Sequence, residues 1–177
     1  MSTSAAPRAY LDHAAAAPVR PQVAEQVAAD LRHRATGWAN PAAQHASGRR
    51  VGALLAEARA RLAAVLDADP HEVIFTSGGT EADALVVTGR VLAARADGVG
   101  TPAIITSPVE HPAVLDSART AEAHLGAEHV EVEVDDAGLV DPESLREAVS
   151  GRRAALVSVM TANNETGAVQ DIGGLVE

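Results

Sequence analysis

Apolar residues recur along the chain with two different periods, and these periods predict helices followed by alternating strands and helices. Residues 21–34 and 49–66 carry apolar side chains at helical spacing, and Pro21 suits the first position of a helix. The polar residues 36–47 between them, with glycine and proline, read as a loop. The predicted apolar faces consist of Val23, Val27, Leu31, Val51, Leu54, Leu55, Ala58, Leu62, Val65 and Leu66.

Beyond residue 70, short apolar runs alternate with helical segments. The predicted strands are residues 73–76, 103–106, 130–134 and 154–160. The predicted helices between them are residues 81–96, 112–125 and 142–149, and a further helix begins shortly before Glu177. This alternation predicts an α/β fold with a mainly parallel sheet. Ligands bind beyond the carboxyl ends of the strands in such sheets, so the polar segments 77–80, 107–111 and 161–167 are the candidate sites.

Composition restricts the chemistry of these sites. The 177 residues carry a formal net charge of −10, include no cysteine, and draw all 14 basic side chains from arginine, so lysine is absent too. These residues therefore offer no disulfide, thiolate metal site or cysteine nucleophile, and no lysine for a Schiff base or a P-loop.

Charge and hydropathy also restrict the expected partners and location. The acidic balance, without a basic stripe, argues against nucleic-acid binding. No segment approaches the roughly 18 apolar residues that span a bilayer, and residues 1–8 lack the apolar core of a signal peptide, so we expect a cytoplasmic protein without membrane contact. We expect no metal site, because no two histidines are spaced as a metal-binding helical pair. The histidines outside the candidate segments are His13, His33, His45, His71, His124 and His129.

The segment Ser77-Gly78-Gly79-Thr80 lies between a predicted strand and a predicted helix. Two glycines let backbone amides approach a ligand, and a helix N-terminus favours an anion such as phosphate. The pattern is neither a Walker loop nor a G-x-G-x-x-G motif, so it does not specify ATP or NAD. The competing interpretation is a capped helix start with a tight turn.

Two further polar segments follow predicted strands. In Glu110-His111-Pro112, the histidine can stack on a ring or transfer protons; the alternative is a surface histidine before a helix-starting proline. In residues 163–167, Asn163 and Asn164 offer donors and acceptors to a ligand, and the alternative is a simple turn.

Five segments, taken in order, resemble the pyridoxal-phosphate-dependent cysteine desulfurases, within the class V aminotransferases. The resemblance extends from about residue 9 to residue 177. The matching segments are Tyr10-Leu11-Asp12-His13-Ala14-Ala15, which is similar to the family's N-terminal strand motif, Asn40-Pro41-Ala42-Ala43-Gln44-His45-Ala46-Ser47-Gly48, Ser77-Gly78-Gly79-Thr80-Glu81-Ala82-Asp83, Glu110-His111-Pro112-Ala113-Val114-Leu115 and Asn163-Asn164-Glu165-Thr166-Gly167.

The resemblance implies the large domain of a fold-type-I transferase, with three α/β/α layers, and a homodimer with pyridoxal 5′-phosphate near its interface. Gly79 and Thr80 would hold the cofactor phosphate. His111 would stack over the pyridine ring and assist proton transfer as the catalytic residue. Asn164 would hydrogen-bond the phenolic oxygen of the cofactor.

The family reaction takes sulfur from L-cysteine, releases alanine and loads a persulfide onto an enzyme cysteine. A sulfur-acceptor protein then receives the sulfur, for iron–sulfur clusters or for thio-cofactors and thiolated RNA. In the family, the aspartate that pairs with the pyridine nitrogen, the Schiff-base lysine and the persulfide cysteine all lie beyond the asparagine motif. Ala84 also stands where the family often has asparagine.

This sequence therefore resembles the N-terminal half of such an enzyme, incomplete at the C-terminus and expected to be inactive alone. We expect an N-terminal arm and strand in residues 1–20, a helical segment in residues 21–70, and the first part of the large domain in residues 71–177. The alternatives are another class V enzyme, such as an aminotransferase or a selenocysteine lyase, or a non-catalytic binding or dimerisation fragment.

Overall fold

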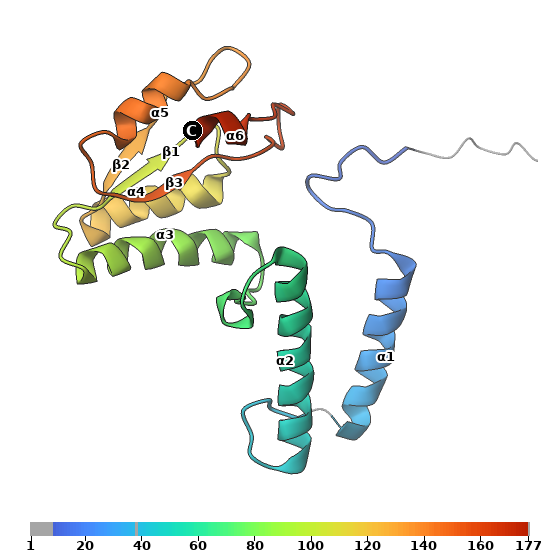
Figure 1. Ribbon diagram of the computed structural model, residues 1–177. Helices are drawn as coiled ribbons and strands as arrows, with labels where there is room; N and C mark the ends of the chain where they lie inside the picture. The colour runs from blue at the N-terminus through green and yellow to red at the C-terminus, as the bar shows by residue number, and fades with distance from the viewer. Residues whose placement is uncertain (1–8, 38, 177) are drawn as a thin grey trace, which may run out of the picture. The chain divides into compact units, whose positions relative to one another are not determined.

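The computed structural model describes residues 9–37 and 39–176, without the side chains of residues 33–37 (Figure 1). The side chain of His33 and the residue Glu177 lie outside this description. The chain divides into two compact units, residues 1–75 and residues 76–177, which are treated separately below. Among the described helices, none is long and apolar enough to cross a membrane.

The first unit consists of three helical elements, α1 (Pro21–Gly37), α2 (Ala46–Leu66) and the short 3₁₀ helix η1 (Pro70–Glu72). Both long helices occupy the predicted segments, and each extends into the predicted loop of residues 36–47. The His45 side chain caps the start of α2 by accepting the N–H of Gly48. The helix ends at Asp67, whose left-handed backbone (φ 52°) stops further helical hydrogen bonding.

Two strand predictions in this region are wrong. Residues 73–76 form no strand, and the segment Tyr10–Asp12 is irregular, followed by a turn at residues 13–15. An apolar run becomes a strand only where a neighbouring strand completes its hydrogen bonds. Here the carbonyl of Val73 accepts instead from the side chain of Arg59, whose guanidinium also lies 5.5 Å from the centre of the Phe75 ring.

The second unit contains a parallel sheet between helices. Its elements are α3 (Gly79–Ala96), β1 (Ala103–Thr106), α4 (Pro112–Leu125), β2 (Glu128–Glu131), α5 (Pro142–Val149), β3 (Ala154–Ser158) and α6 (Ile172–Leu175). The strands are ordered β2-β1-β3, and both neighbouring pairs run parallel. The predicted α/β fold with a parallel sheet is thus confirmed, with β2 starting and ending earlier than expected and β3 ending earlier.

Successive side chains of the central strand β1 point to opposite faces of the sheet and belong to two hydrophobic layers. Ile104 packs with residues of α3 and α4 on one face, and Ile105 packs with residues of α5 and α6 on the other. Both isoleucines are fully buried. The sheet therefore lies between two helical layers, which is the expected α/β/α arrangement (Figure 1).

The connections bring two loops together at one edge of this sheet. The chain runs from β1 through α4 to β2, then through α5 past β1 to β3. Because β1 and β3 are parallel neighbours, residues 107–111 after β1 and residues 159–171 after β3 leave the sheet at the same edge. Two of the three candidate segments belong to these loops.

Candidate functional site

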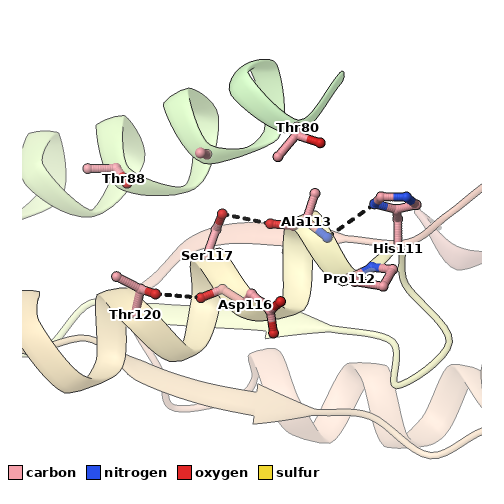
Figure 2. Close-up of a pocket in the computed structure, with 9 residues that line it drawn as sticks. Thr80, Thr88, His111, Pro112, Ala113, Asp116, Ser117 and Thr120 are labelled. Atoms are coloured by element: carbon pink, nitrogen blue, oxygen red, sulfur yellow. Dashed lines mark hydrogen bonds between the residues drawn. The ribbon is translucent and has the colours of Figure 1, made fainter. Parts of the chain in front are cut away.

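A cavity of about 480 Å³ lies between α3 and α4 and extends from their N-terminal ends to Thr88 and Thr120 (Figure 2). It brings together Thr80 and His111, which belong to different candidate segments and stand at the N-terminal ends of the two helices. The remaining lining residues are Ala84, Thr88, Pro112, Ala113, Asp116, Ser117 and Thr120. Hydroxyl-bearing and small side chains from both helices leave this space open, and Ala84 contributes no polar group to it.

The N-terminus of α3 is open toward a ligand. Its N-cap is Gly78, which has no side chain to accept from the N–H groups of the first turn, whereas side chains cap α2, α4 and α5. A Cβ placed on Gly78 or Gly79 would meet no atom within 4 Å. The backbone of Gly78 is extended, so what glycine provides here is space. The first-turn N–H groups of α3 therefore have no side-chain cap, and an uncapped helix start favours an anion; Gly79 itself does not line the cavity.

Two hydrogen bonds between Ser77 and Glu81 fix the loop before this helix. The Glu81 carboxylate accepts from the backbone N–H of Ser77 at 2.7 Å and from its hydroxyl at 2.5 Å. The hydroxyl bond, followed by the backbone bond, holds the pKa of Glu81 below its ordinary value of 4.5. The ionised carboxylate therefore holds Ser77 in place and leaves Gly79 and Thr80 at the exposed start of α3.

His111 is the N-cap of α4. Its Nδ1 accepts the backbone N–H of Ala113 at 3.1 Å, and Pro112 follows as the first helical residue. Because Nδ1 acts as an acceptor, the neutral ring carries its proton on Nε2. The structure thus confirms an exposed histidine before a helix-starting proline, and it places the same side chain at the cavity (Figure 2).

Asn163 and Asn164 occupy different positions in the loop after β3. The Oδ1 atom of Asn163 accepts from the N–H groups of Glu165 and Thr166, and its Nδ2 atom donates to the carbonyl of Val109 at 2.8 Å. Asn163 thus builds the turn and ties it to the loop before His111. Asn164 is exposed, with its Nδ2 atom donating to the Glu165 side chain, and it does not line the cavity.

The turn at Asn163 confirms one of the two interpretations of its segment, whereas the sequence did not reveal the contact of Asn163 with Val109 or the structural role of Glu110. Glu110 is buried and contacts the end of β3, and Asn163 joins the two loops. Only the polar character of the two segments marked them beforehand. The assembled site offers an anion position at the start of α3, a flat ring at the start of α4, and an exposed amide on the neighbouring loop.

The comparisons with known proteins agree on one family. The family model described as aminotransferase class-V matches residues 9–177. A cysteine desulfurase of Frankia sp. (strain EuIK1) is 41% identical over 95% of this chain. An IscS-like cysteine desulfurase of Mycobacterium tuberculosis is 44% identical over 93% of this chain. The solved structure of a NifS-like protein matches 96% of this chain with a TM-score of 0.81 and 30% identity.

The matches cover nearly all of this chain but less than half of each relative. This chain spans 40% of the Frankia relative, 41% of the Mycobacterium relative and 44% of the NifS-like chain. The chain therefore corresponds to less than half of each of these proteins.

Proposed function

Because this chain belongs to the class-V aminotransferase family, we propose that it forms the phosphate- and ring-binding part of a pyridoxal 5′-phosphate (PLP) site in a cysteine desulfurase. The observation that carries the proposal is the shared cavity of Thr80 and His111, at the starts of two neighbouring helices. One helix offers a position for a phosphate, and the other offers an aromatic ring beside it. A phosphorylated ring compound requires that pair of features.

The residues present fit PLP in shape and in donor chemistry. The glycine start of α3 leaves room for a phosphate, and its first-turn N–H groups with the Thr80 hydroxyl supply donors. The imidazole of His111 supplies a flat surface for a pyridine ring. When bound, PLP supplies an electron sink that weakens the bonds to the α-carbon of an amino acid.

Each residue then has a defined task. Gly79 and Thr80 bind the phosphate and thereby fix one end of the cofactor. His111 stacks on the ring and, through Nε2, holds or moves a proton of the substrate. Asn164 donates to the phenolic oxygen from the loop after β3, which the Asn163–Val109 hydrogen bond holds close to His111.

The proposed reaction moves the sulfur of L-cysteine to a cysteine thiol of the enzyme, which gives alanine and an enzyme persulfide. Neither lysine nor cysteine occurs in these 177 residues, so both groups must come from elsewhere in the active assembly. We further propose a cytoplasmic homodimer that passes the sulfur to an acceptor protein. Both relatives are cysteine desulfurases, which favours a desulfurase over an aminotransferase or a selenocysteine lyase.

The test uses the full-length protein, meaning the product of the natural gene with any residues that it encodes before or after these 177. We expect it to release alanine from L-cysteine in equal amount to the sulfur it transfers. Formation of the keto acid from cysteine would indicate an aminotransferase, and turnover of L-selenocysteine alone would indicate a selenocysteine lyase. Protein that binds PLP and turns over none of these substrates would contradict the proposed activity.

A further inference from the structure

Glu110 is a buried acid whose hydrogen bonds reach the loop after β1 and the end of β3. Only 8% of the surface of this residue is exposed to solvent. Its Oε1 atom accepts from the hydroxyl of Ser107 at 3.2 Å and from the backbone N–H of Met160, and its Oε2 atom accepts from the hydroxyl of Ser158 at 3.0 Å. Ser107 directly follows β1, whereas Ser158 and Met160 lie at the end of β3.

These partners are all neutral donors. The ion pairs found among the described residues involve other carboxylates. Burying a carboxyl group without a cation is costly, and hydrogen bonds to the charged form offset the cost only when their geometry is kept. Three donors from the ends of two neighbouring strands and the loops that follow them converge on this carboxyl group, so it restricts how those loops leave the sheet.

Glu110 and its hydrogen-bond partners lie directly beside the residues of the proposed cofactor site. Glu110 precedes His111, and Met160 begins the loop that contains Asn164. The Asn163–Val109 hydrogen bond and the backbone bond from Ser107 to Ser158 join the same two loops. The side chains for the ring and for the phenolic oxygen thus stand on loops that Glu110 holds together.

We propose that Glu110 is a positioning residue that sets the separation between His111 and Asn164 and so fits the site to the ring of PLP. This inference rests on the proposed function. The carboxylate of Glu110 touches neither the phosphate position nor the cofactor, and it acts through the two loops. Its loss should therefore impair binding of the ring and leave binding of a phosphate at Thr80 unchanged.

The test compares two probes on the full-length protein by calorimetric titration. Pyridoxamine 5′-phosphate carries the ring and the phosphate but no aldehyde, so it reports the contacts without a covalent bond to lysine. Inorganic phosphate reports the start of α3 alone. The variants are Glu110→Gln, which keeps the volume but points an amide N–H at a donor, and Ser158→Ala, which removes a single hydrogen bond. Glu147→Gln, an exposed carboxylate on α5, is the matched control.

We expect Glu110→Gln to weaken pyridoxamine 5′-phosphate binding by about tenfold or more, the size of one lost polar contact, and Ser158→Ala to weaken it less. Phosphate affinity should change by less than about twofold in either variant. Equal loss for both probes, or no loss for either, would overturn the positioning role and leave the proposed function intact. Wild-type protein that binds phosphate but not pyridoxamine 5′-phosphate would overturn the proposed function, and the positioning role with it. Should Glu110→Gln fail to fold, Ser158→Ala decides alone by the same criterion.

Discussion

The Nδ1 atom of His111 accepts the backbone N–H of Ala113 at 3.1 Å, so the residue that faces the cavity also starts the helix beneath it. The cap fixes the orientation of the ring through the backbone of α4. It also assigns the proton of the neutral ring to Nε2. A substitution at His111 therefore removes two separable contributions, one to folding and one to binding.

Replacement of His111 by asparagine and by alanine should separate these contributions. Asparagine is a good N-cap, and alanine cannot accept the Ala113 N–H, so His111→Ala should lower the free energy of unfolding by about 1 kcal/mol relative to His111→Asn. Both variants lose the ring and should bind pyridoxamine 5′-phosphate more weakly than wild type. Urea unfolding and calorimetric titration measure the two effects. Equal stability of the two variants would show that the cap contributes nothing.

At Gly78, in contrast to His111, we expect a substitution to stabilise the fold, because the start of α3 has no side-chain cap. Replacing Gly78 with serine introduces a side chain that can cap the helix, without a clash, because the added Cβ meets no atom within 4 Å. Gly78→Ser should raise the free energy of unfolding by a few tenths of a kcal/mol. It should also weaken phosphate binding, because the new hydroxyl occupies the N–H groups that the anion needs. Unchanged phosphate affinity in a folded Gly78→Ser protein would place the anion elsewhere.

The two hydrogen bonds between Ser77 and Glu81 make the stability of the start of α3 depend on pH. The two hydrogen bonds lower the pKa of Glu81 in the folded state, so they stabilise the fold above the ordinary value of 4.5. That stabilisation declines as the pH falls through the lowered pKa. Ser77→Ala should return the pKa toward 4.5, because it removes the hydroxyl bond that contributes most. An NMR titration of the Glu81 side chain in the wild-type protein and in Ser77→Ala measures the shift.

The helices of the first unit expose apolar side chains that the sequence pattern assigned to a core. Val23, Val27 and Leu31 on α1 are each about half exposed, and Val65 on α2 is 81% exposed. We expect the isolated 177-residue chain to self-associate at micromolar concentration, as large exposed apolar patches do.

Val65→Arg should reduce this association, whereas Ala60→Arg adds the same charge on another face of α2 and should not. Light scattering over a range of concentrations measures the difference. A wild-type chain that stays monomeric over that range would contradict the expectation.

Local signals in the sequence predicted the elements whose ends are set by local chemistry. The helix Pro112–Leu125 has a histidine cap and a proline at its start and the left-handed Gly126 (φ 68°) at its end. The buried strand Ala103–Thr106 is a short apolar run flanked by polar turns. In contrast, residues 73–76 have strand-forming side chains and no strand, because a strand depends on a neighbour that local sequence does not report.

The candidate site likewise combines features that local sequence predicts with contacts that it does not. The helix starts near Thr80 and at His111 were predictable from their own segments, whereas the roles proposed for these two residues come from the family resemblance. The contacts of Glu110 with Ser158 and Met160 join residues 48 and 50 positions apart, and no periodicity connects them. The sequence placed Asn164 in a segment after a strand, but it could not show that this side chain lies outside the cavity.

The central claim is that Thr80 holds a phosphate and His111 holds the ring attached to it. Calorimetric titration of the full-length protein with pyridoxamine 5′-phosphate and with inorganic phosphate, in wild type, Thr80→Val and His111→Asn, tests it most directly. Thr80→Val removes the hydroxyl at nearly constant volume and should weaken both ligands. His111→Asn keeps the helix cap and should weaken only pyridoxamine 5′-phosphate. The claim is contradicted if His111→Asn weakens both ligands equally or if Thr80→Val weakens neither.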